Sequence, residues 1–233
     1  MLSDLFDPEK TAEAWQVISR TFPLALWETL YVTALASLFA VLIGLPLGIL
    51  LVAGEKDGVL PLPAWLLRLI NALVNVLRSV PFLILMILAI PLTRAIMGTS
   101  VGTAPSIVPL VIAAFPFVAR LAESSLREVD GRLIEMARSF GASPGQIIWK
   151  VMLRESIPSL LSNATIAITT ILSYSAMSGI IGGGGLGKIA IDYGYYRYRY
   201  LIMLAAALLL VVLVQLIQSL GSYLARKTDK RSG

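Results

Sequence analysis

Hydrophobic residues fill long stretches of this chain, and short polar stretches separate them. Residues 29–54 and 200–225 each run for 26 positions without a charge, and residues 156–187 run for 32. Two further apolar regions flank the polar turn GTSVGT at 98–103. A helix needs about 20 mostly apolar residues to cross a bilayer. The pattern therefore predicts an all-α membrane protein with five transmembrane helices, at about 24–53, 67–92, 105–128, 157–180 and 200–225.

Prolines interrupt the second and third of these predicted helices. Their positions are Pro81 and Pro91 in one, and Pro105, Pro109 and Pro116 in the other. Membrane helices tolerate proline where neighbouring protein or a cavity satisfies the freed carbonyl groups. We therefore expect these two helices to face packed protein rather than open lipid.

Composition supports the membrane interpretation and excludes several kinds of chemistry. Hydrophobic residues make up 57% of the 233, only 14% are charged, and the mean hydropathy is +0.82. A soluble domain has about a quarter of its residues charged. The chain has no Cys and no His, which excludes disulfides, thiol nucleophiles, imidazole bases and the usual zinc ligands. Without paired carboxylates either, we expect no enzyme activity, no bound cofactor and no metal site.

The distribution of Lys and Arg predicts the orientation. With five spans the termini lie on opposite sides, and 13 of the 19 basic residues then fall on the side of the tail 226–233. The positive-inside rule makes that side cytoplasmic, with the N-terminal segment 1–22 outside. That segment is acidic and amphipathic, unlike a signal peptide. The cluster YYRYRY at 195–200 is basic on the outer side, where its tyrosines suit an aromatic belt.

A charged segment at 129–155, hereafter the inserted segment, separates the third and fourth predicted spans. Leu133, Met136, Ala137 and Phe140 recur at the spacing of one apolar helix face. Gly141 follows at the position where a helix ends in a left-handed residue. The segment therefore begins with a short helix, which by itself fits a hairpin on the cytoplasmic surface.

A second short helix is predicted directly afterwards. Ser143 can cap it, Pro144 suits its first position, and Gln146 completes a capping box. Its apolar stripe is formed by Ile147, Ile148, Val151 and Met152.

The inserted segment resembles the EAA motif of binding-protein-dependent ABC transporter permeases, E-A-A-x(3)-G-x(9)-I-x-L-P. The matching residues are Glu135, Ala137, Gly141 and Leu153, and the departures are Met136 for Ala, Val151 for Ile and Arg154 for Pro. The resemblance implies that the segment contains a coupling helix, which docks on a separate ATPase subunit. It assigns ATPase coupling to Glu135, Met136, Ala137, Gly141, Ala142 and Leu153.

The resemblance extends over residues 24–225 and points to methionine ABC transporter permeases. It is carried by SYSAMSGIIGGGGLGKIAIDYGYYRY (173–198), and by WETLYVTALASLFAVLIGLPLGILL (27–51), NVLRSVPFLILMILAIPLTRAIMGTSVG (75–102) and AAFPFVARLAES (113–124). It implies the type I importer fold in the bacterial cytoplasmic membrane, working by alternating access. The implied partners are a second permease copy, two ATP-binding cassette subunits that carry the ATP and magnesium, and an extracytoplasmic substrate-binding protein. The expected cargo is L- and D-methionine or close analogues, and no nucleic acid is expected to bind.

The route of the substrate is open to two interpretations. Ser162, Thr165, Thr169 and Ser173 share one face of the fourth span. They either line the path or let neighbouring helices approach closely. The candidates for a path or gate are Ser173, Tyr174, Met177 and Ser178. Arg78 is the candidate intramembrane charge, facing either protein or the membrane interface.

Three other functions compete with a methionine permease. A permease for another amino acid or small solute has the same residue chemistry. An ion-coupled secondary transporter predicts intramembrane acids or histidines, whereas Glu28 and Glu123 fall at the ends of predicted spans. A non-transporting membrane scaffold does not explain the EAA-like motif.

The stretch GGGGLGK at 182–188 fits most of the phosphate-loop pattern G-x-x-x-x-G-K-[ST]. However, Ile189 stands where the magnesium-binding hydroxyl is needed, and a predicted membrane helix precedes the stretch instead of a strand. The orientation also places Lys188 outside the cell. We expect no nucleotide here, and glycines that let the chain fold back on itself.

Overall fold

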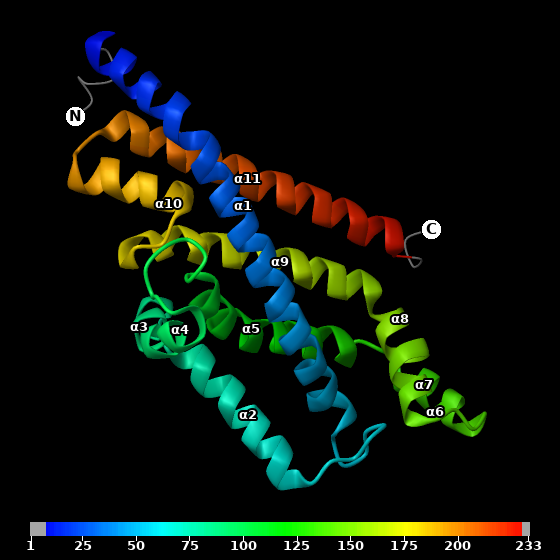
Figure 1. Ribbon diagram of the computed structural model, residues 1–233. Helices are drawn as coiled ribbons and strands as arrows, with labels where there is room; N and C mark the ends of the chain where they lie inside the picture. Colours follow the sequence, from blue (N-terminus) through cyan, green and yellow to red (C-terminus); the bar gives the residue numbers. More distant parts are fainter. Residues whose placement is uncertain (1–7, 230–233) are drawn as a thin grey trace. The chain divides into compact units, whose positions relative to one another are not determined.

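The computed structural model describes residues 8–229 of the chain, and these residues are almost entirely helical (Figure 1). The long helices are α1 (Pro8–Ala53), α2 (Ala64–Ser79), α5 (Ile107–Arg127), α9 (Ile157–Ser178) and α11 (Tyr200–Thr228). The shorter ones are α3 (Phe82–Leu88), α4 (Ile90–Met97), α6 (Gly131–Ser139), α7 (Pro144–Ile147), η2 (Ile148–Met152), α8 (Leu153–Glu155), η3 (Gly179–Ile181), α10 (Gly185–Ile189) and η4 (Ala190–Tyr196). No strand occurs between residues 8 and 229.

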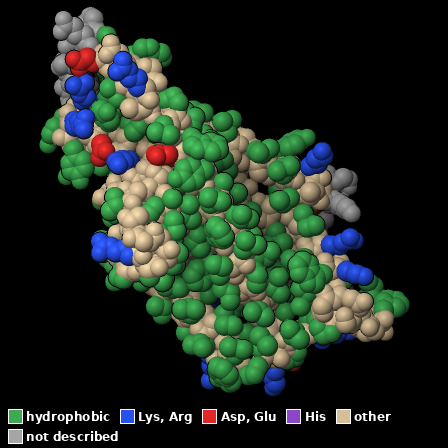
Figure 2. Space-filling model, in the orientation of Figure 1, with side chains coloured by type: hydrophobic (Ala, Val, Ile, Leu, Met, Phe, Trp, Pro, Cys, Tyr) green, Lys and Arg blue, Asp and Glu red, His purple; other side chains and the backbone are tan. Residues whose placement is uncertain are grey.

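Helices long and apolar enough to cross a membrane confirm the predicted fold class. Among residues 8–229 four stretches qualify individually, Thr11–Ala53, Ile107–Arg127, Ile157–Ile181 and Tyr200–Thr228, and the number is five if α2 and α3, which meet at a bend of 109°, count as one broken span. Many large apolar side chains remain exposed, among them Leu208, Leu216 and Leu220 of α11. Figure 2 shows a surface on which hydrophobic side chains predominate. Such a surface is suited to lipid rather than to water.

The second predicted span differs from the structure, because it is not one helix. α2 ends at Ser79, and Val80 is extended, with φ −80° and ψ 127°. Pro81 explains the break, since the residue before a proline is pushed out of the helical region. The segment predicted as 67–92 is therefore divided among α2, α3 and the start of α4.

The chain ends also differ from the predicted boundaries. α1 begins at Pro8, so most of the predicted N-terminal segment 1–22 continues directly into the first span. α11 continues to Thr228, into the predicted tail 226–233. Residues 1–7 and 230–233, including the basic residues of the tail at 230 and 231, lie outside the described residues.

The chain forms two compact units, and α1, α5, α9 and α11 contribute residues to both. The first unit comprises residues up to 37, 82–112 and 168–217. The second comprises 38–81, 113–167 and the residues from 218 onwards. The GGGGLGK stretch belongs to the first unit, and the inserted segment belongs to the second.

Close contact between α1 and α5 organises the second unit. A Cβ on Gly44 would lie 2.7 Å from the carbonyl oxygen of Phe115, and one on Gly48 would lie 2.7 Å from that of Ala119. Small residues one helical turn apart let two membrane helices approach until their backbones touch. These two glycines therefore fix α5 against α1.

We expect Gly48→Val to destabilise the protein by about 1–3 kcal/mol, because the added methyl groups would overlap Ala119 and Ala122 of α5. The measurement is the midpoint of thermal unfolding of the detergent-solubilised protein. Gly131→Ala is the control, since nothing lies within 4 Å of a Cβ at that position. Equal midpoints for the two variants would contradict the proposed helix contact.

Candidate functional site

The inserted segment starts with a capped helix. Asp130 precedes α6 and its side chain accepts a hydrogen bond from the Arg132 backbone N–H at 2.9 Å. The side-chain hydrogen bond between Arg132 and Asp130, together with the negative charge of the carboxylate, raises the pKa of the Arg132 guanidinium. α6 ends as predicted, with Gly141 in the left-handed region at φ 77°.

The second short helix has the predicted capping box. The Ser143 hydroxyl accepts from the Gln146 N–H at 3.4 Å, and the Gln146 side chain accepts from the Ser143 N–H at 2.9 Å. Pro144 occupies the first turn of α7. The helix then continues as the π-helical η2, and the predicted stripe runs from Ile147 of α7 to Met152 of η2.

Apolar contacts hold the inserted segment within the second unit. Ile147 and Met152 are buried in one cluster with Ala53, Val59 and Leu126. The partly buried residues around this cluster include three of the predicted coupling residues, Ala137, Ala142 and Leu153. The segment is therefore packed on the end of α1 and on α5, and does not hang free.

Three large apolar side chains of the inserted segment are exposed. Phe140 is 85% exposed, Trp149 is 69% exposed and Met136 is 53% exposed. Only part of the predicted apolar face of α6 therefore packs within the chain, through Ala137 and not through Met136 or Phe140. Glu135 lies on the same exposed helix. Exposed large apolar side chains on short capped helices are suited to contact with another protein.

The residues predicted to form a path or gate separate into two groups. Ser173 and Met177 are exposed and line a groove of about 550 Å³ with residues of α10, η4 and α11. Tyr174 stacks on Phe82, with ring centroids 4.2 Å apart. Ser178 is buried and donates its hydroxyl hydrogen to the Ser175 carbonyl at 2.7 Å. Ser173 and Met177 thus face the groove, while Ser178 supports the backbone.

The polar face of α9 is also divided. Ser162 and Ser173 are exposed, whereas Thr165 and Thr169 are buried. A Cβ on Gly221 of α11 would collide with the Thr165 side chain. Thr165 is therefore better explained by the packing of two helices than by the lining of a substrate path.

The GGGGLGK stretch uses its backbone to bind α1 within the first unit. Gly185, at φ 85°, donates its N–H to Glu28 Oε2 at 2.8 Å, and Leu186 donates its N–H to Thr29 Oγ1 at 2.9 Å. Glu28 Oε1 also accepts from the Thr103 hydroxyl at 2.9 Å. Two of the amides that a phosphate loop would offer are thus already bound to the protein itself. The expected backbone reversal is confirmed, because Gly182 is also left-handed.

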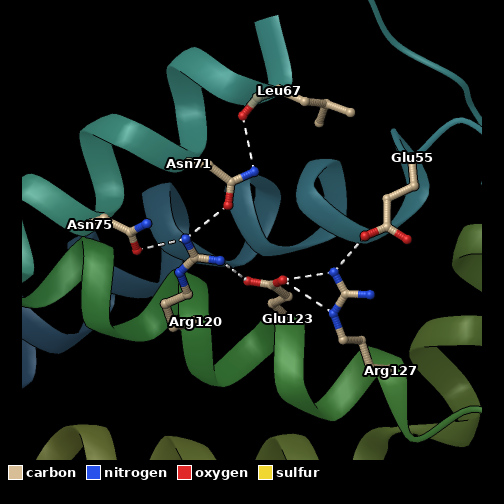
Figure 3. Close-up of polar contacts among 7 residues, drawn as sticks. All are labelled: Glu55, Leu67, Asn71, Asn75, Arg120, Glu123 and Arg127. Atoms are coloured by element: carbon tan, nitrogen blue, oxygen red, sulfur yellow. Dashed lines mark hydrogen bonds and ion pairs between the residues drawn. The ribbon is translucent and has the colours of Figure 1, made fainter. Parts of the chain in front are cut away.

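An ionic network lies within the second unit, where the sequence predicted no site (Figure 3). Arg120 Nη1 donates to Glu123 Oε2 at 2.5 Å. Arg120 Nη2 donates to the side-chain oxygens of Asn71 and Asn75, both at 2.8 Å. Only 19% of the Arg120 side chain and 11% of the Glu123 side chain are exposed. Ionised groups within a membrane span are costly unless they are paired in this way.

The same network continues to the loop after α1. Arg127 Nη2 donates to Glu123 Oε1 at 2.9 Å and to Glu55 Oε1 at 2.6 Å (Figure 3). Two guanidinium groups and two carboxylates therefore balance each other in charge. The six residues Glu55, Asn71, Asn75, Arg120, Glu123 and Arg127 are called the charge network below.

The sequence contains a signal for this network that our prediction did not use. Arg120, Glu123 and Arg127 recur at three- and four-residue spacing, and so do Asn71 and Asn75. We placed Glu123 at a span end and took Arg78 as the intramembrane charge. Arg78 is exposed, and no ion pair of Arg78 is found among residues 8–229.

Three tyrosines of the cluster YYRYRY at 195–200 are exposed. Tyr195, Tyr196 and Tyr198 are 72%, 62% and 82% exposed. Arg199, directly before α11, pairs with Glu13 of α1 at 2.8 Å within the first unit.

Comparison with known proteins identifies the kind of chain. A family model described as binding-protein-dependent transport system inner membrane component matches residues 44–230. The probable D-methionine transport system permease protein MetI of Vibrio cholerae is 51% identical over 208 residues, covering 89% of this chain and 92% of that protein. The D-methionine transport system permease protein MetI of Escherichia coli K12 is 46% identical over 154 residues, covering 66% and 70%.

A solved structure resembles the chain closely. The structure of the MetNI methionine ABC transporter in inward-facing conformations has a TM-score of 0.89 and 43% identity, covering 91% of this chain and 98% of that one. An amino acid ABC transporter with histidines has a TM-score of 0.74 at 20% identity, which shows the shared fold alone.

We expect Glu28→Ala to loosen the GGGGLGK stretch. Losing the carboxylate leaves the Gly185 N–H without its acceptor, which costs about 1–3 kcal/mol. Hydrogen exchange at the amides of residues 185 and 186 should therefore accelerate by roughly tenfold or more. Glu13→Ala removes an exposed carboxylate bound to Arg199 instead, and should leave these amides unchanged. Unchanged exchange in Glu28→Ala would show that the contact does not hold the stretch.

Proposed function

Because the chain belongs to the family of binding-protein-dependent transport system inner membrane components, we propose that it is the permease subunit of an ATP-driven methionine importer. The observation that carries the choice of cargo is the 51% identity to a probable D-methionine permease over 89% of the chain. L- and D-methionine or close analogues are the proposed substrates. A permease for another amino acid or small solute is the second candidate, because it would have the same residue chemistry.

The proposed assembly places ATP on another polypeptide. Two copies of this chain form the path, two ATP-binding cassette subunits bind ATP and magnesium, and a substrate-binding protein delivers methionine from the outer side. The close structural similarity to a chain of the MetNI methionine ABC transporter supports such an assembly. ATP binding and hydrolysis would move the path between outward and inward access by rigid-body motion of helices.

The inserted segment is the proposed site of contact with the ATPase. Its two helix ends are fixed by Asp130 and by the capping box of Ser143 and Gln146, and Ile147 and Met152 anchor it. A rigid, anchored segment can pass a displacement to α1 and α5. The exposed coupling residues Glu135, Met136 and Gly141 would meet the ATPase, while Ala137, Ala142 and Leu153 would hold the segment in place.

The groove beside Ser173 and Met177 is the proposed surface of the substrate path. Its lining is mainly apolar, with Ser173 and Gln215 as polar exceptions. Methionine has an apolar thioether side chain, and flexible apolar surfaces suit such a group.

The test is reconstitution of the chain with its ATPase subunit and substrate-binding protein in a bilayer. We expect ATP hydrolysis to rise only when binding protein and methionine are both present. Leucine and other amino acids serve as competitors. Stimulation by leucine but not by methionine would favour the second candidate, and no stimulation by any amino acid would contradict both.

We expect Phe140→Asp to weaken assembly with the ATPase subunit. Because Phe140 is 85% exposed, the substitution should change the free energy of unfolding by no more than about 0.5 kcal/mol, as for other surface substitutions. A charge placed in an apolar contact should nevertheless lower the amount of co-purified ATPase severalfold. Val101→Asp, at a residue that is 63% exposed and lies in the other unit, is the control. Full co-purification with Phe140→Asp would exclude this face from the contact.

A further inference from the structure

Polar contacts supplement the limited burial of α2. Val74 is the one buried side chain of α2. Asn71 and Asn75 lie on either side of it in the sequence and accept hydrogen bonds from the same atom, Nη2 of Arg120. The Asn71 amide is oriented for this by its own bond to the Leu67 carbonyl at 3.0 Å. One guanidinium of α5 therefore holds two successive turns of α2.

The guanidinium of Arg120 is in turn held by carboxylates that lead toward the inserted segment. Glu123 binds Arg120 and Arg127, and Arg127 binds Glu55. Glu55 belongs to the loop after α1, and three residues later the Gly58 carbonyl accepts from Arg138 Nη2 at 2.6 Å. Arg138 lies on α6. An unbroken series of charged hydrogen bonds and one short loop thus joins α2 to the first helix of the inserted segment.

The bonds of Arg120 are not saturated. Its Nε is buried and has no acceptor among residues 8–229. A buried donor without a partner costs about 1–3 kcal/mol, and native structures keep few of them. The arrangement therefore leaves Arg120 with a donor that can gain a partner if α2 or α5 shifts.

From this geometry we propose that Arg120 is a positioning residue that links α2 to the ATPase-contacting segment. Its fork holds α2 on α5 while Glu123, Arg127 and Glu55 hold the loop beside α6. Displacement of α6 pulls on the loop through Arg138 and changes the hold on α2. This inference rests on the proposed function, because it assigns the series of contacts to the coupling between ATP hydrolysis and transport.

Two variants break the fork in different ways. Arg120→Lys keeps the positive charge beside Glu123, but one ammonium group cannot reproduce the planar fork that reaches three acceptors. The double variant Asn71→Leu, Asn75→Leu keeps the ion pair of Arg120 and Glu123 and removes only the hold on α2. The double variant therefore decides the question if Arg120→Lys fails to insert.

The experiment measures methionine uptake and ATP hydrolysis in the same proteoliposomes, containing the complete assembly. We expect the number of methionine molecules transported per ATP hydrolysed to fall about fivefold or more in both variants. Fivefold is the lower end of the range over which two coupled sites typically affect each other. ATP hydrolysis itself should persist within about twofold. A ratio equal to that of the unaltered assembly, or a parallel fall in both rates, would overturn the inference and leave the network as a structural brace.

A matched control and a double-mutant cycle sharpen the result. Asn163→Leu removes an amide of α9 that bonds Ser125 and the Leu121 carbonyl of α5, outside the charge network. Its ratio should not change. Arg138→Ala should lower the ratio, and combining it with the Asn71, Asn75 double variant should add little, because both act on one series of contacts.

Independent, additive losses in that cycle would overturn the proposed link. If the unaltered assembly shows no methionine uptake at all, the proposed function fails rather than this inference.

Discussion

The hydrocarbon of a bilayer offers no hydrogen-bond partners, and this absence constrains every polar group in the spans of this protein. Arg120 and Glu123 satisfy most of the constraint by pairing at 2.5 Å and by binding groups on α2 and, through Arg127, in the loop after α1, and only Arg120 Nε of this pair is left without an acceptor among residues 8–229. Glu28 satisfies it by accepting backbone N–H and hydroxyl groups around the GGGGLGK stretch. In each case a charge placed on a membrane helix ties that helix to a distant part of the chain. The charged residues of the spans therefore act as structural joints.

In the inserted segment, near neighbours rather than distant residues bind the polar groups at the helix ends. Its backbone ends are satisfied locally, by Asp130 and by the pair of Ser143 and Gln146, so it keeps its shape without a partner. Its buried side chains anchor it, and the large apolar side chains of Met136, Phe140 and Trp149 remain exposed among charged ones. A short element that is capped, anchored and carries exposed apolar side chains can dock on another protein and transmit displacement into the spans. This division of roles is the physical basis of the proposed coupling to an ATPase.

Local patterns in the sequence predicted the apolar membrane helices, the capping box and the left-handed Gly141, because each depends on near neighbours alone. The break at Val80 could also have been predicted, because Val80 precedes Pro81. We predicted one continuous span there because the apolar residues continue on both sides of the proline. The partners of Arg120 could not be derived, because Asn71 and Asn75 lie 49 and 45 residues away in the chain. The exposure of Phe140 could not be derived either. Which face of α6 is buried depends on the positions of α1 and α5, which are also distant in the sequence.

Accumulation of labelled methionine tests the central claim most directly. Proteoliposomes should contain two copies of the chain with the ATPase subunits, ATP enclosed, and binding protein added outside. We predict that methionine accumulates inside against its gradient, and only when enclosed ATP and external binding protein are both supplied. Accumulation without ATP, or none in a fully assembled complex whose ATPase is active, would contradict the assignment of this chain as an ATP-driven methionine permease.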